Sequence, residues 1–133
     1  MFLHLLNKTQ RQCFCNVVRF IIMADGVVNE SEHRILQLAQ REMGLDELPA
    51  PVTSLALLAT QLNVFESPMS RNILMLESVG AAMADGEIPQ SEMDILTQLC
   101  DCLQIPEKRI DEFKELAESA NELHLKAEKL IFS

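Results

Sequence analysis

The sequence is poor in the residues on which β-rich folds depend. Among its 133 residues there is no tryptophan and no tyrosine, and there are only four glycines and five prolines. Because turn-forming residues are few and gather at a few points, we exclude an all-β fold. Aromatic side chains are scarce although 48% of the residues are hydrophobic, so aliphatic side chains must fill the core, which favours packed helices. The length suits a single domain spanning residues 1–133.

Positive charge is also scarce. Eleven basic side chains against twenty acidic ones give a net charge of −9, and no segment concentrates lysine and arginine. A nucleic-acid binder needs a basic surface that displaces counterions from the phosphates. We therefore exclude nucleic acid as a direct partner. An acidic chain is compatible with cations, with basic protein partners, or with solubility alone.

Long apolar runs are missing as well. The longest uncharged run, residues 48–65, contains two prolines and several polar residues, so we expect no transmembrane segment. The apolar start, residues 1–6, has neither a charged region before it nor a cleavage site after it, so we do not interpret it as a signal peptide. We expect a soluble, cytoplasmic protein, and peripheral association with a membrane complex stays open.

The four cysteines form two Cys-x-Cys pairs, Cys13 with Cys15 and Cys100 with Cys102. Residues two apart on a helix point about 200° apart, so neither pair can hold one metal ion from one helix face. The usual zinc-ligand spacings are absent. We interpret the cysteines as small buried side chains in a reducing compartment.

An internal repeat at an offset of 60 residues dominates the sequence. The segment MADGVVNESEHRILQLAQREMGL at residues 23–45 aligns without a gap with MADGEIPQSEMDILTQLCDCLQI at residues 83–105. With the helical patterns before each segment, the repeat predicts two helix–loop–helix units, residues 7–45 and 67–105. Residues 46–66 connect them, and a last helix covers residues 106–131. The predicted fold class is an all-α bundle whose two units are related by a pseudo-twofold axis.

Local signals set the expected helix ends. Gly26 and Gly44 each follow a helical pattern, as a glycine does where φ must turn positive. Asn29 with Glu32 makes a capping box, and Ser67 with Pro68 makes a preferred helix start. Prolines 49 and 51 break the connector before a short apolar helix at residues 54–61. The second helix of the first unit should bury Ile35, Leu38, Ala39 and Met43. The second helix of the second unit should bury Ile95, Leu96, Leu99 and Leu103.

Two packing hypotheses follow from the pattern of side-chain sizes. Phe20-Ile21-Ile22 aligns with Gly80-Ala81-Ala82, so the bulky first helix could fill a groove that the small residues around Gly80 leave. In the last helix one apolar face should lie across the bundle as a surface helix. That face comprises Ile110, Phe113, Ala117, Ala120, Leu123, Ala127 and Leu130. Its spacing does not require a homodimer, so the oligomeric state stays open.

The repeated acidic loops are the candidate site. Asp25-Gly26-x-Val28-x-x-x-Glu32 and its copy from Asp85 to Glu92 match the second half of a calcium-binding EF-hand loop. The first and third ligand positions lack side-chain oxygens, which excludes an ordinary EF-hand. Two facing loops could still pool four carboxylates around one divalent cation. The alternative is purely structural, because an acid near a helix N-terminus gains from the helix dipole. The candidate metal ligands are Asp25, Glu32, Asp85 and Glu92.

The duplicated Met-Ala-Asp-Gly segments, each followed by an aliphatic residue at Val28 or Ile88 and by a Ser-Glu helix start, resemble the TerB-like family. That family is named after bacterial tellurite-resistance proteins and is also found fused to J-domain co-chaperones. The resemblance covers residues 16–116 and implies an all-α fold of two helical hairpins with pseudo-twofold symmetry. It also implies a non-catalytic protein linked to stress responses, to protein complexes near the membrane, and to metal binding through loop acids.

Carried onto this chain, the family's metal binding implies the same loop acids, Asp25 and Asp85 with Glu32 and Glu92. Uncharged residues at Val27, Asn29, Pro89 and Gln90 depart from a richly acidic loop and weaken that implication. No nucleophile–base pair, HExxH motif or phosphate loop indicates an enzyme, and the three histidines, His4, His33 and His124, should lie at the surface. We therefore expect a non-catalytic protein-interaction module, and the alternative is a divalent-cation-binding or metal-sensing protein.

The cation hypothesis predicts a metal-dependent melting temperature. Ca²⁺, Mg²⁺, Mn²⁺ or Zn²⁺ added after EDTA treatment should raise the melting temperature of the wild type, and the shift should vanish in the Asp25→Asn/Asp85→Asn variant. A ligand at 100 times its dissociation constant that binds only the folded state adds about 2.7 kcal/mol. If no ion shifts the melting temperature of the wild type, or if the shift is the same in the variant, the result would contradict a cation site in the loops.

Overall fold

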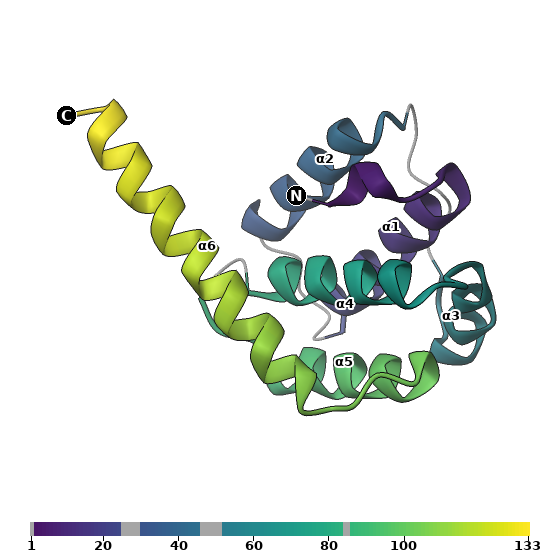
Figure 1. Cartoon of the computed structure of the whole chain (residues 1–133). Helices are drawn as coiled ribbons and strands as arrows, with labels where there is room; N and C mark the ends of the chain where they lie inside the picture. Colours follow the sequence, from purple (N-terminus) through teal and green to yellow (C-terminus); the bar gives the residue numbers. More distant parts are fainter. Residues whose placement is uncertain (1, 25–29, 46–51, 84–85) are drawn as a thin grey trace.

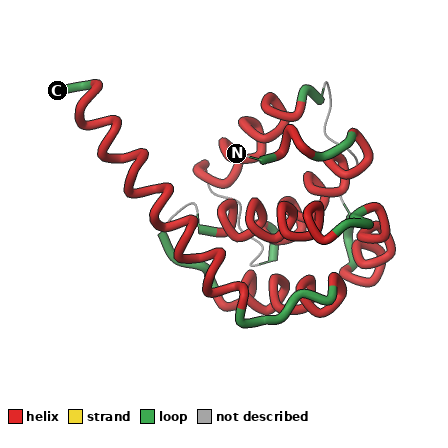
Figure 2. The backbone as a smooth tube through the Cα atoms, in the orientation of Figure 1, coloured by secondary structure: helices red, strands yellow, loops and turns green. Residues whose placement is uncertain are grey.

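The computed structural model describes residues 2–24, 30–45, 52–83 and 86–133, although within residues 30–45 the side chains of residues 30–32, 35 and 39 are not described. Over these residues the chain forms an all-helical bundle without strands (Figures 1 and 2). In chain order the elements are η1 (Leu3–Leu5), α1 (Lys8–Ile22), α2 (Glu30–Met43), α3 (Leu55–Gln61), η2 (Leu62–Val64), α4 (Pro68–Ala82), α5 (Gln90–Leu103) and α6 (Arg109–Ile131).

The helix bounds follow the repeat of the sequence. α1 and α4 begin and end 60 residues apart, and so do α2 and α5. Asn7 caps α1 and Ser67 caps α4, each through a capping box with the residue three positions on. The predicted start at Ser67 and Pro68 and the predicted short helix in the connector, α3, are confirmed. A pseudo-twofold axis relating the two units stays a prediction.

The ends of α2 and α5 are also equivalent. Gly44 follows α2 with φ +68°, and Gln104 follows α5 with φ +59°. In both places the amide of the next residue donates a hydrogen bond to a carbonyl in the last turn of the helix. The Leu45 amide donates to the Gln40 carbonyl at 3.1 Å, and the Ile105 amide donates to the Cys100 carbonyl at 2.9 Å. The predicted stop at Gly44 is confirmed. The predicted features at Gly26, Asn29, Pro49 and Pro51 lie outside the described residues.

An arginine at the same position in each unit connects the first helix of that unit to the segment before it by hydrogen bonds to backbone carbonyls. Arg11 donates through Nη1 to the Met43 carbonyl at 2.9 Å, and through Nε and Nη2 to the carbonyls of Leu3 and His4. Met43 ends α2, where carbonyls lack a partner within the helix, so the guanidinium also caps α2. Sixty residues on, Nε of Arg71 donates to the Phe65 carbonyl at 2.8 Å.

α4 is the central helix of the bundle. It packs against α1, α2, α5, α6 and η1, and Figure 1 shows it running between the α1–α2 pair and α5. Such a helix needs apolar side chains on several faces rather than one stripe. The buried residues of α4 meet that need: Ser70, Ile73, Leu74, Met75, Ser78, Val79, Ala81 and Ala82. The predicted core of α5 is likewise confirmed for Leu96, Leu99 and Leu103, and Ile95 is partly buried.

The predicted core of α2 is wrong in one position. Leu38 is 54% exposed, whereas Leu36, which the predicted stripe left out, is only 5% exposed. Met43 is buried as predicted, and the side chains of Ile35 and Ala39 are not described. Residues two apart point about 200° apart on a helix. These two leucines therefore lie on different faces of α2. The position of α1, against which α2 packs, decides which of them is buried.

The expectation that the last helix lies across the bundle is also wrong for its second half. The start of α6 packs on α4, with Ile110 buried and Phe113 and Ala117 partly buried. Every residue from Asn121 onward is exposed, and Figure 1 shows this end of α6 projecting away from the other helices. The helical period predicts which residues share a face of α6, but it does not predict whether another helix packs against that face. At 23 residues α6 is longer than α4, the helix on which it packs.

A reciprocal exchange at the two equivalent helix ends should change stability in opposite directions. Gly44→Gln should lower the free energy of unfolding by about 1 kcal/mol, because glutamine must adopt a left-handed backbone there. Gln104→Gly should raise it by a similar amount. Urea unfolding followed by circular dichroism measures both values. A Gln104→Gly protein no more stable than the wild type would contradict strain at that helix end.

Candidate functional site

The structure leaves the predicted loop site largely outside the part of the chain that it describes. Asp25 and Asp85 fall among the residues that are not described, and of Glu32 only the backbone, in the first turn of α2, is described. Glu92 is the one predicted ligand whose side chain is described. The prediction that the four carboxylates share a cation therefore stays a prediction. Among the described side chains, no three histidine, cysteine, aspartate or glutamate residues are grouped for a metal ion.

Glu92 lies inside the bundle. It belongs to the first turn of α5 and is only 1% exposed. A carboxylate in a first helical turn interacts favourably with the positive end of the helix dipole. Such a structural role fits the alternative interpretation of the acidic loops, at least for this residue.

Three of the four cysteines are buried as predicted. Burial raises the pKa of the Cys13 thiol to about 12 and the pKa values of the Cys15 and Cys100 thiols to about 11. These thiols therefore stay protonated near neutral pH, a state in which sulfur is neither a good nucleophile nor a metal ligand. The prediction is wrong for Cys102, which is exposed. It lies on the opposite side of α5 from Cys100, two residues and about 200° away, and that side faces solvent at Cys102.

The three histidines are surface residues, as predicted. His4 and His33 are exposed, and the His124 ring lies on the projecting half of α6. Nε2 of His124 approaches Oε1 of Glu128 to 3.0 Å, one helical turn on, with both side chains in solvent. Such exposed pairs contribute little to stability.

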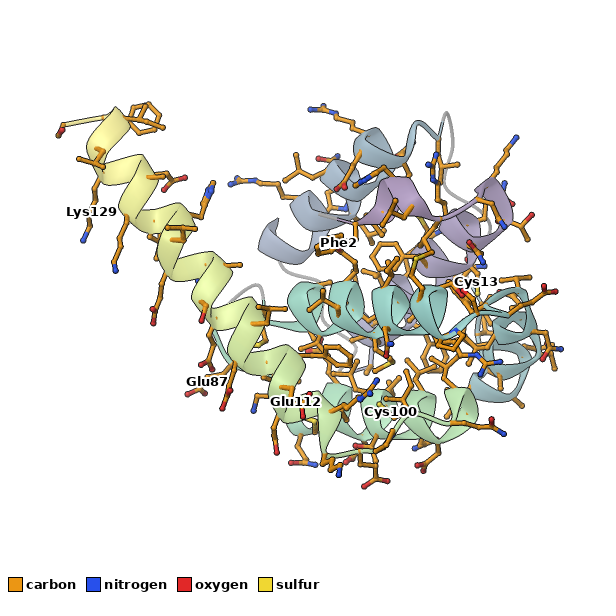
Figure 3. The ribbon with its side chains drawn as sticks, viewed as in Figure 1. Phe2, Cys13, Glu87, Cys100, Glu112 and Lys129 are labelled. Carbon is orange, nitrogen blue, oxygen red and sulfur yellow. The ribbon has the colours of Figure 1, made fainter. Side chains whose placement is uncertain are left out.

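A groove between α4 and α6 is the feature that the sequence did not predict. It has a volume of about 670 Å³ and is open on one side. α4 contributes Leu76, Glu77 and Gly80, Met83 follows the last residue of α4, and α6 contributes the turns from Leu116 to Leu123. Phe2 also lines the groove, and its amide donates a hydrogen bond to Oε1 of Glu77 at 2.8 Å. Figure 3 shows Phe2 next to the bundle and Lys129 far along the projecting helix.

Gly80 leaves free space along the wall of this groove. A Cβ atom built on Gly80 would meet no heavy atom within 4 Å, apart from its own helix backbone and chain neighbours. No described side chain therefore fills the space beside Gly80 itself. α1 packs against α4, and a contact of Phe20 with α4 stays a prediction. A second hollow of about 230 Å³ shares Glu77 and Gly80 with the first and extends to Leu38 of α2. The open surface thus crosses α4 from α6 to α2.

The charged side chains lining the groove are all acidic. Glu77 comes from α4, and Glu118 and Glu122 come from α6, while no described lysine or arginine lines the groove. Leu76, Met83 and Leu123 supply apolar surface between them. An apolar groove with an acidic border is suited to a ligand that is apolar on one side and positively charged on its flanks.

The sequence contained one signal for this groove. Gly80-Ala81-Ala82 places three small residues near the end of a helix, where a glycine costs stability relative to alanine. These small residues indicate a missing volume, and the structure has free space beside Gly80. Whether a neighbouring helix fills such a volume depends on where that helix lies, which the repeat alone does not specify.

Comparison of the chain with models of protein families, with curated proteins and with solved structures gives no match. Among the described helices, none has the length and apolar character needed to cross a membrane.

The burial of the thiols predicts selective labelling. At pH 8 a thiol reagent should modify Cys102 of the folded protein rapidly, and it should modify Cys13, Cys15 and Cys100 only after unfolding, because raised pKa values and burial keep them unreactive. Mass spectrometry of the labelled chain counts the modified thiols. A Cys102→Ser variant should show no rapid labelling, and rapid labelling of that variant would contradict the predicted burial.

Proposed function

We propose that this chain is a non-catalytic protein-interaction module that binds a helical segment of a partner in the groove between α4 and α6. The observation that carries the proposal is the continuity of this acidic-bordered apolar groove with the exposed apolar face of α6. Leu116 and Leu123 line the groove and are 55% and 69% exposed. Apolar surface that is left open in this way marks sites of protein interaction.

The shape and chemistry of the groove favour a helix as its ligand. Two neighbouring helices, α4 and α6, form its walls, and an amphipathic helix lays its apolar face into such a channel. The gap at Gly80 gives room for a large side chain of the ligand. Glu77, Glu118 and Glu122 would pair with lysine or arginine on the flanks of the ligand helix. A basic amphipathic helix therefore fits better than an acidic one.

The resemblance of the Met-Ala-Asp-Gly segments to the TerB-like family supports the same class of function. That resemblance implies a non-catalytic helical protein that works in stress-related complexes. The groove adds a physical site at which such a complex could form. Divalent-cation binding through the loop acids is the alternative, and the melting experiment with added ions tests it separately.

The groove can be tested with designed peptides and a single blocking substitution. A leucine-and-lysine amphipathic helical peptide should bind the wild type in fluorescence anisotropy, and a matched leucine-and-glutamate peptide should not. Gly80→Phe should weaken binding of the first peptide by at least about tenfold, because the phenyl ring would occupy the free space without changing the charge.

Gly80→Ala is the matched control. Its methyl group meets nothing, so the groove stays open, and the substitution in a helix interior should raise stability by about 0.5–1 kcal/mol. Peptide affinity of this variant should equal that of the wild type. Equal affinity of the wild type and Gly80→Phe would show that the peptide binds through charge elsewhere, and would contradict the groove as the binding site.

A further inference from the structure

The exposed face of α6 repeats every seven residues. Leu116, Leu123 and Leu130 are seven residues apart and are 55%, 69% and 80% exposed. Two alanines, Ala120 and Ala127, lie between them on the same face, and Phe113 precedes them in the same spacing of three and four residues. A seven-residue repeat of this kind forms the line of contact, or seam, between paired helices, and alanine in a seam lets two helix backbones approach closely. The seam of α6 comprises Leu116, Ala120, Leu123, Ala127 and Leu130.

We propose that the helix received by the groove is α6 of a second copy of this chain, running antiparallel to the first. This inference rests on the proposed function and names the partner of the same site. The seam has a self-complementary register about a twofold axis near residues 121 and 122. In that register Ala120 faces Leu123 of the second copy and Leu116 faces Ala127 of the second copy. Small and large side chains then alternate in every layer between Leu116 and Ala127.

The charges along α6 favour the antiparallel direction. Residues 111–122 carry five acidic side chains and one lysine, whereas residues 123–133 carry two lysines and one glutamate. A parallel pair would place the two acidic halves side by side. An antiparallel pair places the lysines near the end of one α6, Lys126 and Lys129, alongside the acidic first half of the other. The acidic first half of α6 thus meets the basic end of the same helix in a second copy.

The groove also explains how so short a seam could hold a dimer. The apolar repeat from Phe113 to Leu130 spans fewer than the three to four heptads that a coiled coil usually needs. In the antiparallel register the end of the second α6 lies alongside the first half of α6, where Leu76 and Gly80 of α4 and the following Met83 form the opposite wall of the groove. α4 therefore adds apolar surface that an isolated helix pair would lack.

The unsupported half of α6 gives a second reason for a partner. Residues 121–133 are all exposed, including Leu125, Ile131 and Phe132. A helical segment of this length without tertiary contacts is only marginally stable in water. Pairing with a second α6 would bury its seam and stabilise the helix to its end.

Sedimentation equilibrium of the full chain tests the proposal. The wild type should dimerise, and Leu123→Ser/Leu130→Ser should raise the dissociation constant at least about a hundredfold, since two exposed seam side chains are lost. Leu125→Ser is the matched control, because Leu125 is 49% exposed on the same helix but outside the seam, and it should dimerise like the wild type. Gly80→Phe should weaken the dimer, and Gly80→Ala should not.

Charge reversal and a distance measurement test the direction of the pair. Lys126→Glu/Lys129→Glu should weaken the dimer, and adding Glu112→Lys/Glu115→Lys to the same chain should restore it, because Glu112 and Glu115 lie on the same flank of the seam as Lys126. Spin labels on Ser133→Cys, in a Cys102→Ser background, should lie roughly 35 Å apart in an antiparallel pair, from the helical rise on both sides of the axis. A parallel pair would bring the labels to roughly 10 Å, the distance across two packed helices, and would overturn the proposal.

Failure of this inference is distinguishable from failure of the proposed function. A wild type that stays monomeric at every concentration but binds the basic peptide in a Gly80-dependent way would overturn the dimer and leave the interaction module intact. A dimer that tolerates Leu123→Ser/Leu130→Ser would overturn the α6 seam. A chain that neither dimerises nor binds the peptide would overturn both.

Discussion

The burial of α4 from several sides is the constraint on which the rest of the structure depends. Leu74, Met75 and Val79 are fully buried, and α4 touches both helices of the first unit, its own partner α5 and the last helix α6. Truncating one fully buried leucine to alanine typically costs about 2–5 kcal/mol, a large part of the stability of a domain of this size. The positions of α1, α5 and the start of α6 therefore all follow from how α4 is covered.

The same constraint produces the groove. α4 must be apolar or small on most sides, yet near its C-terminal end Gly80 faces a space that no described residue fills. α6 packs beside it only through its first turns, so the channel between them stays open and is bordered by glutamates. In this way a helix that organises the core also presents apolar surface to the outside. The proposed interaction site is therefore attached to the most firmly packed element of the fold.

The exposed seam of α6 and the groove are two parts of one surface. Leu116 and Leu123 belong to both, so a helix that enters the groove also contacts the seam. The acidic first half and the basic end of α6 give that surface a direction. An antiparallel second copy would use all three features at once, whereas another basic amphipathic helix would use the groove and its acidic border.

The sequence by itself determined the all-helical class, the 60-residue repeat and several helix ends, because capping residues, glycines and the helical period act within a few residues of the chain. Ser67 and Gly44 are examples. Only the tertiary structure decided that Leu36 rather than Leu38 faces the core, that the space at Gly80 stays open, and that α6 leaves the bundle after Ala120. Each of these depends on where a distant helix lies, and a local pattern states which residues share a face but not what covers that face.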